Sequence, residues 1–307
     1  MSALRGNDNN AFLKDPIIFI GTGRSGTTII SEMLFQHEDL AWPSNYQEKV
    51  PTIPSINLLR GLFDNRFWRL IGKKKGLYGS AFYNKFLFEP GENYAMWQYL
   101  VGNEIDFSRG FLLDEKASPE RREFIRGYFT QMVKAQGKKR LAFKITGPPR
   151  MGFLLSIFPD AIFVQINRNT IPTISSLLKV NFWRTQGRTR LWWTGPYDTA
   201  EEDWARENRD NPELMTAFQL KKIHWAEQTE AARYQPRILA VKYEDFTADP
   251  LREIKRILDY CGLAFDTRIS KYLSANPVVP RNKPKEAYFS KELLKQIDEL
   301  MKREATD

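Results

Sequence analysis

The chain has 307 residues, and its 46 Lys and Arg against 37 Asp and Glu give a formal net charge of +9. With 42% hydrophobic and 27% charged residues, the composition is that of a globular protein and excludes a disordered or fibrous one. A single cysteine, Cys261, excludes a disulfide scaffold, and with only two histidines a structural zinc site lacks ligands.

No stretch of the sequence is apolar for the roughly 20 residues that a membrane-spanning helix needs. The apolar runs Ile17–Ile20 and Ala161–Ile166 are far shorter, and residues 1–15 form a polar tail without the apolar core of a signal peptide. We therefore expect a cytoplasmic protein with no stable membrane insertion. The basic excess suits an anionic partner, although solvated Lys and Arg faces account for such a charge equally well.

The first predicted strand, Pro16–Ile20, runs directly into the glycine-rich turn GTGRSGTT at 21–28. Apolar residues then recur at helical spacing over 29–34. Residues 40–140 are harder to assign, because turn signals alternate with patches rich in Trp, Tyr and Lys. Within them we predict one helix, Phe124–Lys134.

From residue 141 onward, strands and helices alternate regularly. The predicted elements are strand Leu141–Ile145, a helix ending at Phe158, strand Ala161–Ile166, helix Pro172–Val180, helix Glu213–Arg233, strand Ile238–Lys242, helix Pro250–Tyr260 and helix Ser290–Arg303. This alternation indicates a mainly parallel sheet covered on both faces. Residues 181–212 are an insertion dense in Trp and Arg. We expect one α/β domain over 1–307, with a P-loop-like sheet flanked by helices and an inserted aromatic and basic cap.

The glycine-rich turn suits a phosphate-like anion, because backbone N–H groups and the helix dipole converge where a strand feeds such a turn and then a helix. Its spacing matches G-x-x-x-x-G-K-[ST] except that Thr27 replaces the lysine. Arg24 supplies a cation instead, and Thr27 and Thr28 supply hydroxyls. We expect a smaller anion than a Mg-bound triphosphate. A turn that only packs the strand on the helix is the plainer alternative.

Four segments together resemble sulfotransferases that use 3′-phosphoadenosine 5′-phosphosulfate (PAPS). The stretch FIGTGRSGTT resembles their 5′-phosphosulfate loop, in the Arg-Ser-Gly-Thr-Thr branch of tyrosylprotein sulfotransferases and bacterial relatives. The further segments, in order, are FKITGPPRMGFLLSIFPD, FPDAIFVQINRNTIPTISSLL and VKYEDFTADPLREIKRILDYCGL. The resemblance runs from Ile17 to about Leu263, with 40–140 and 181–212 unmatched. It implies transfer of a sulfuryl group from PAPS to a hydroxyl or amine, with release of PAP and no metal.

The resemblance also implies which residues bind the co-substrate. These are Gly23, Arg24, Ser25, Gly26, Thr27, Thr28, Arg168, Ser176, Tyr243 and Arg281. Arg168 ends a strand, where ligands of open α/β sheets bind, and a guanidinium can hold a 3′-phosphate with two hydrogen bonds. Ser176 follows at the family's eight-residue spacing, and Ser175 replaces it if the helix phase is off by one.

The less specific of these assignments have plainer alternatives. Arg168 could be a solvated charge at a strand end, and Tyr243 could be an ordinary core residue. The loop that carries Arg281, Lys283 and Lys285 does not match the family wording, so a solvated charge run explains it nearly as well.

Sulfuryl transfer, like phosphoryl transfer, needs in-line positioning and stabilisation of charge on the equatorial and leaving oxygens. The resemblance implies that Lys144 lies near the bridging oxygen and that Arg24 assists it. The acceptor must also lose a proton to a general base. Strict family spacing of that base falls on Asn45, so Glu48 is the best match and requires a short insertion.

Other bases stay open. His37 is one candidate, although its place at a helix end favours a structural role, and Asp39 and Glu115 are two more. The acceptor itself is undetermined. The rings and arginines of 67–83 and 181–204 suit a sugar, a phenol, an amphiphilic lipid or an acidic peptide, and we favour a small-molecule, glycan or lipid hydroxyl over a protein tyrosine. A cap that packs its own tryptophans fits as well.

Two alternative functions compete with sulfuryl transfer. A P-loop kinase of a small metabolite would bind Mg-ATP, but the sequence lacks its lysine at Thr27. A non-catalytic protein that binds polyanions would follow from the net charge alone. We expect no nucleic-acid partner, because the sequence contains no recognisable nucleic-acid module. The oligomeric state is not encoded in these patterns.

Overall fold

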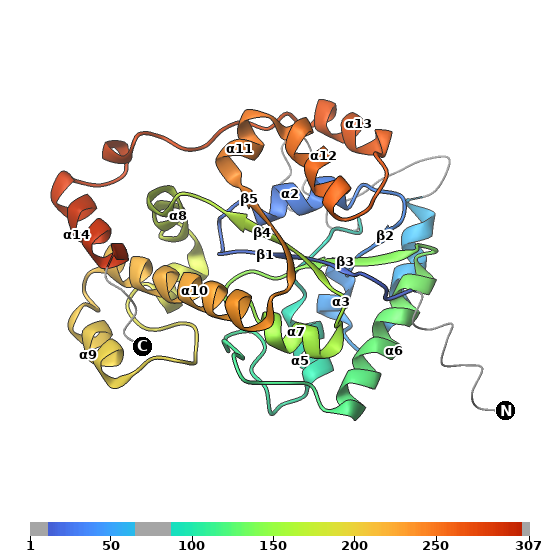
Figure 1. Cartoon of the computed structure of the whole chain (residues 1–307), viewed down its shortest axis with the longest axis horizontal. Coiled ribbons are helices and arrows are strands. Elements are labelled where there is room, and N and C mark those ends of the chain that lie inside the picture. Colours follow the sequence, from blue (N-terminus) through green and yellow to red (C-terminus); the bar gives the residue numbers. More distant parts are fainter. Residues whose placement is uncertain (1–11, 65–86, 303–307) are drawn as a thin grey trace.

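The computed structural model describes residues 12–64 and 87–302. Its centre is a five-stranded sheet of order β2-β3-β1-β4-β5, in which every neighbouring pair is parallel (Figure 1). The strands are β1 (Ile17–Ile20), β2 (Leu40–Ala41), β3 (Arg140–Lys144), β4 (Ile162–Asn167) and β5 (Arg237–Lys242). The predicted α/β class with a parallel sheet is confirmed.

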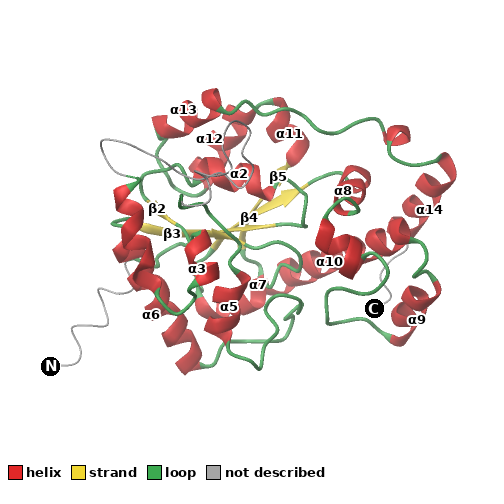
Figure 2. Ribbon diagram, turned by 180° about the vertical axis from the view of Figure 1, so that it is seen from behind, coloured by secondary structure: helices red, strands yellow, loops and turns green. Residues whose placement is uncertain are grey.

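Helices surround this sheet (Figure 2). They are α2 (Thr27–Leu34), α3 (Asn45–Lys49), η1 (Pro54–Leu62), α5 (Tyr94–Val101), α6 (Pro119–Ala135), α7 (Met151–Ile157), α8 (Thr170–Leu177), η2 (Trp183–Gly187), α9 (Thr199–Glu207), α10 (Pro212–Tyr234), α11 (Tyr243–Ala248), α12 (Pro250–Tyr260), α13 (Thr267–Ala275), η3 (Lys285–Ala287) and α14 (Lys291–Lys302). Among the helices of the described ranges, none is long and apolar enough to cross a bilayer.

Strands β1, β3 and β4 are buried on both faces, to which their successive side chains alternately point, whereas the edge strand β5 is largely half-buried or exposed. Ile18 and Phe143 face one side, where they join a core with residues of α5, α6 and α7. Ile17 and Phe19 face the other side and join a core with residues of α2, α12 and α13. This two-sided burial explains why the strands are short apolar runs.

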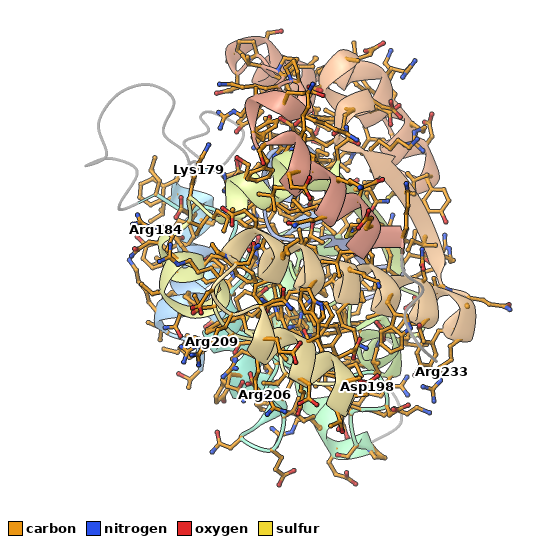
Figure 3. The ribbon with its side chains drawn as sticks, turned by 90° about the vertical axis from the view of Figure 1, so that its left-hand side faces the viewer. Lys179, Arg184, Asp198, Arg206, Arg209 and Arg233 are labelled. Atoms are coloured by element: carbon orange, nitrogen blue, oxygen red, sulfur yellow. The ribbon has the colours of Figure 1, made fainter. Side chains whose placement is uncertain are left out.

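The cap predicted at 181–212 lies beside α10 and contains η2 and α9. Trp183 and Trp193 are buried with their rings 5.1 Å apart, and the indole N–H of Trp183 donates to Oγ1 of Thr216 at 2.9 Å. These two tryptophans are therefore packed into a core that the cap shares with α8, α10 and α14. Its arginines lie outside: Figure 3 shows Arg184 and Arg206 at the periphery of this side of the molecule.

A buried carboxylate fixes the start of α7. Glu230 of α10 accepts hydrogen bonds from the backbone N–H groups of Met151 and Gly152, at 3.0 and 2.9 Å. Burial raises the pKa of Glu230 to about 7, and the two backbone N–H groups and the charge of Arg150 only partly oppose this shift.

This raised pKa gives a testable pH dependence. Between the ordinary value of 4.5 and about 7, the folded state keeps a proton on Glu230 that the unfolded state has lost. The group's contribution to stability is therefore complete below pH 4.5 and is lost as the pH rises through 7, by up to about 3 kcal/mol. Urea unfolding should show that Glu230→Gln destabilises more at about pH 5 than at about pH 8. If Glu230→Gln lowered the free energy of unfolding equally at both pH values, the raised pKa of Glu230 would be contradicted.

Candidate active site

The turn between β1 and α2 lies at the carboxyl end of the central strand. Two of its residues have left-handed backbone conformations, Arg24 with a φ of 71° and Gly26 with a φ of 100°. Gly26 is also the N-cap of α2, so a residue without a side chain stands where the helix begins. The first N–H groups of α2 thus face the concave side of the turn, which is the arrangement that binds anions. We call residues 21–28 the cradle.

Gly26 is in close contact with Tyr243, the first residue of α11. A Cβ atom on Gly26 would lie 2.4 Å from Cδ2 of the Tyr243 ring. Tyr243 is buried, and its ring lies under the guanidinium of Arg168, whose Cζ is 4.6 Å from the ring centroid. Tyr243 thus connects the cradle to the ends of β4 and β5.

Gly26→Ala should therefore destabilise the protein by about 2 kcal/mol, because it combines overpacking with an unfavourable φ. Gly127→Ala is the matched control: Gly127 lies in α6 with open space around its Cα, so alanine there should stabilise by about 0.5–1 kcal/mol. Urea denaturation of both variants measures the difference. A neutral Gly26→Ala would show that Tyr243 moves aside freely.

Lys144 is brought to the cradle by the sheet register. It is the last residue of β3 and lies beside Phe19 of β1. Its side chain is fully buried, and its Nζ donates a hydrogen bond to Oγ1 of Thr28 at 2.9 Å. A lysine and a hydroxyl, both expected from the sequence to act on the same ligand, therefore lie together at the start of α2.

Arg24 of the cradle lies close to two further arginines, Arg168 and Arg281. Nε of Arg24 donates to Oγ of Ser176 at 2.9 Å, and Nη1 of Arg168 donates to the carbonyl oxygen of Arg24 at 2.9 Å. Burial, followed by the positive charges of Arg168 and Arg281, lowers the pKa of Arg24. Like charges placed this close are stabilised by an anion that binds between them.

Two cavities share these three arginines. One, of about 180 Å³, is also lined by Gly26, Thr27 and Thr28 of the cradle and by Tyr243. The other, of about 410 Å³, is also lined by Ser175, Ser176, Lys179 and Lys283. The site therefore has a cradle end and a second cationic end, with Arg24, Arg168 and Arg281 between them. Of the residues predicted from the sequence, Lys285 lies nearby in η3.

Asn282 and Glu244 complete the arginine cluster and were not singled out from the sequence. Nε and Nη2 of Arg168 donate to Oδ1 of Asn282 at 3.0 and 2.7 Å, and Nδ2 of Asn282 donates to Oε1 of Glu244 at 2.6 Å. The C-terminal loop is thereby tied to the ends of β4 and β5. The only signal for Asn282 was its place between Arg281 and Lys283.

Glu48 lies on α3, is exposed, and accepts a hydrogen bond from the backbone N–H of Ala95 at 3.1 Å, near the start of α5. A second carboxylate, Glu92, was missed from the sequence. Its Oε2 accepts a hydrogen bond from Oγ1 of Thr146 at 3.0 Å. Thr146 follows Lys144 by two residues, and the N–H of its neighbour Gly147 donates to the carbonyl of Gly21 at 3.1 Å. Glu92 therefore lies at the same edge of the sheet as the cradle.

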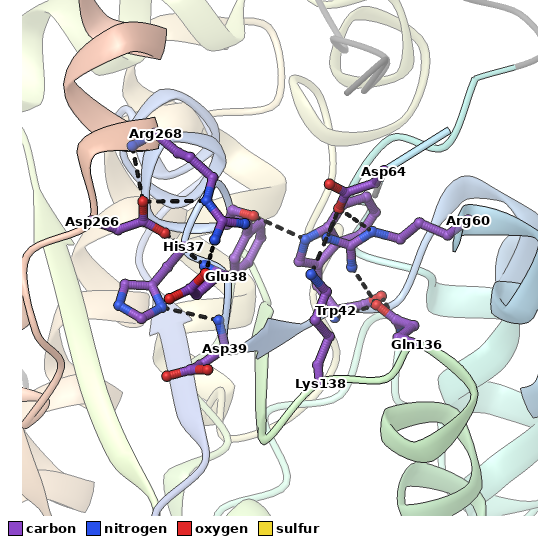
Figure 4. Close-up of polar contacts among 11 residues, drawn as sticks. His37, Glu38, Asp39, Trp42, Arg60, Asp64, Gln136, Lys138, Asp266 and Arg268 are labelled. Atoms are coloured by element: carbon purple, nitrogen blue, oxygen red, sulfur yellow. Dashed lines mark hydrogen bonds and ion pairs between the residues drawn. The ribbon is translucent and has the colours of Figure 1, made fainter. Parts of the chain in front are cut away.

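The other carboxylates and the histidine lie elsewhere. The N–H groups that begin β3 donate to the carbonyl of Asp39, so Asp39 and the neighbouring His37 lie at the amino edge of the sheet, opposite the cradle (Figure 4). His37 accepts from the N–H of Asp39 at Nδ1 and bonds to the carbonyl of Ala264 through Nε2. Glu115 is exposed and lines a cavity that does not include the arginine cluster.

Comparison with known proteins agrees with this geometry. The model of the "Sulfotransferase family" matches residues 16–267, so the chain belongs to the sulfotransferase family. Sulfotransferase STF9 from Mycobacterium avium superposes with a TM-score of 0.58 at 18% identity, over 99% of this chain and 80% of that one. Sulfotransferase STF1 from Mycobacterium tuberculosis H37Rv superposes with a TM-score of 0.52 at 15% identity, over 97% of this chain and 80% of that one. These structures share the fold. The comparison with curated proteins gives no match.

Proposed function

We propose that this sulfotransferase transfers the sulfuryl group of PAPS to a hydroxyl or amine and releases PAP. The observation that carries the proposal is the pair of cavities that share the lining residues Arg24, Arg168 and Arg281. A nucleotide with phosphate groups at both its 3′ and 5′ positions needs two such anion sites. A kinase would need only the cradle end, and the lysine that it would use there is absent.

The residues of the cradle fit the 5′ end of this nucleotide. Oγ of Ser25 is buried and has no hydrogen-bond partner among the described residues, which suits an acceptor from outside the chain. The N–H groups at the start of α2, with the hydroxyls of Thr27 and Thr28, would bind the phosphate oxygens. Gly23 and Gly26 let the backbone approach them.

The second cationic end fits the 3′-phosphate. Arg168 uses three of its five N–H donors within the described structure, so two remain for a ligand. Ser176 would add a hydroxyl, and Arg281 would close the site from the C-terminal loop. Tyr243 would support both ends through its contacts with Gly26 and Arg168.

The chemistry would rest on charge compensation and one proton acceptor. PAPS supplies an activated sulfuryl group, and Lys144 and Arg24 would offset the charge that develops on the leaving phosphate oxygen. We propose no role for a metal ion because these two cations already meet that need. Glu48, from the sequence, and Glu92, from its place beside Thr146, are the two candidates for the base that deprotonates the acceptor.

Calorimetric titration with PAP, AMP and Mg-ATP tests the proposal. We expect tight binding of PAP without Mg²⁺ and much weaker binding of AMP. Arg168→Ala should weaken PAP binding by about tenfold to a hundredfold, as expected for a lost charged hydrogen bond, and leave AMP unaffected. The control is Arg233→Ala, an exposed arginine that pairs with Asp114.

Each rival function predicts a different result. Preference for Mg-ATP would favour the kinase. Equal, steeply salt-dependent binding of PAP and AMP would favour the polyanion-binding protein. If PAP is preferred, the acceptor can then be sought among glycans, lipids and small molecules, with labelled PAPS.

A further inference from the structure

The side chain of Asn282 lies between a cation and an anion. Its Oδ1 accepts hydrogen bonds from Nε and Nη2 of Arg168 at 3.0 and 2.7 Å, and its Nδ2 donates to Oε1 of Glu244 at 2.6 Å. A guanidinium can only donate and an ionised carboxylate can only accept, so these partners fix which end of the amide faces each of them. One neutral side chain therefore joins two groups of opposite charge.

Arg168 and Glu244 leave neighbouring strands at the same edge of the sheet. The last residues of β4 and β5 are in register, and the two charged residues follow these strand ends closely. Oε1 of Glu244 also accepts a hydrogen bond from the backbone N–H of Asn169, the residue after Arg168, at 3.1 Å. The ion pairs of the described residues nevertheless include none between Arg168 and Glu244. The carboxylate instead meets the guanidinium through the amide of Asn282.

The contacts of Arg168 hold its guanidinium without neutralising it. Besides its bonds to Asn282, it donates through Nη1 to the carbonyl oxygen of Arg24 at 2.9 Å, and its Cζ lies 4.6 Å from the centroid of the Tyr243 ring. Each of these partners is uncharged. A carboxylate paired with an arginine competes with a phosphate for the same charge, whereas a neutral oxygen or a ring does not. The arrangement therefore leaves the charge of Arg168 to an anionic ligand.

Asn282 lies next to the ligand space without lining it. Arg168 and Arg281 line both cavities, and Lys283 lines the larger one. Asn282, between Arg281 and Lys283 in the chain, lines neither cavity. Its effect on a bound ligand therefore passes through Arg168.

We propose that Asn282 is a positioning residue of the 3′-phosphate site. It keeps the carboxylate of Glu244 away from Arg168 and holds the guanidinium where it lines both cavities. The inference rests on the proposed function and adds to it a role for the C-terminal loop. Without the amide, Glu244 pairs with Arg168 and competes with the 3′-phosphate.

Titration of the whole chain with PAP and AMP tests the proposal. Asn282→Ala should weaken PAP binding by about tenfold, because the phosphate then competes with a carboxylate, and leave the binding of AMP, which lacks the 3′-phosphate, unchanged. Asn282→Asp keeps the shape of the side chain but places a carboxylate on Arg168, so PAP binding should fall by about a hundredfold. The matched control is Asn208→Ala, at a half-buried asparagine that donates to the carbonyl oxygen of Trp204 in the cap, and it should bind as the wild type does.

A double variant separates positioning from packing. Adding Glu244→Gln to Asn282→Ala removes the competing charge and should restore PAP binding to nearly the wild-type value. A role in loop packing alone predicts that the second change weakens binding further. Failure of this rescue would overturn the proposal, as would Asn282→Ala and Asn282→Asp proteins that keep the full preference for PAP over AMP. A wild-type protein without that preference would contradict the proposed function and, with it, this inference.

Discussion

Replacing Lys144 with methionine should lower kcat by about a thousandfold while changing the Kd of PAP only a few-fold. Methionine keeps much of the length and the apolar stem of a side chain that is fully buried at the end of β3. What it removes is the ammonium group next to Oγ1 of Thr28. The ammonium charge stabilises the transition state most, because the leaving oxygen becomes negative there. Its removal should therefore lower kcat much more than it weakens PAP binding.

The matched control is Lys242→Met. Lys242 is also the last residue of a strand, β5, but it is exposed. Steady-state kinetics with labelled PAPS should therefore show unchanged turnover for Lys242→Met. Unchanged turnover for Lys144→Met as well would remove Lys144 from the reaction.

Glu92→Gln should reduce kcat by about 10²–10⁴-fold, the usual contribution of a general base, and Glu48→Gln should reduce it less. Glu92 contacts Thr146 at the strand end that carries Lys144, whereas Glu48 bonds to the backbone of α5. A glutamine in place of Glu92 keeps the size of the side chain and an oxygen for Thr146, but its amide cannot take up the acceptor's proton.

Measuring kcat across pH distinguishes a base from a positioning residue. Loss of a base removes the acidic limb of the profile, and a purely structural change only scales it. Glu115→Gln, at an exposed carboxylate apart from the arginine cluster, is the control and should be fully active. An inactive Glu48→Gln beside an active Glu92→Gln would assign the base to Glu48.

The sheet was largely predictable because β1, β3 and β4 are buried on both faces and β5 is a short apolar run that follows a helix. The runs at 16–20, 141–145, 161–166 and 238–242 fall within one or two residues of β1, β3, β4 and β5. β2 has only two residues, which are too few to give a recognisable hydrophobic pattern in the sequence. The helices that bury an ordinary apolar stripe, such as α6 and α12, were also found.

Residues 40–118, which precede α6, were not predictable for a physical reason. η1 turns its polar side chains inward, so the rule that apolar positions mark the buried side fails there. Glu92 follows the cradle by more than sixty residues, and only the fold brings it to Thr146. Asn282 acts through a hydrogen bond across the site rather than through a motif. The roles of the residues carried over from the family stay predictions until the variants are measured.

The position of β1 has a consequence for the order in which the protein assembles. It is the first strand among the described residues, yet its two neighbours begin with residues 140 and 162. Closing such long loops is slow, because the entropy is lost before the contacts form. During synthesis β1 cannot pair with β3 until nearly half of the chain has emerged, or with β4 until more than half has. The glycine-rich turn that follows it is therefore made early and becomes rigid late.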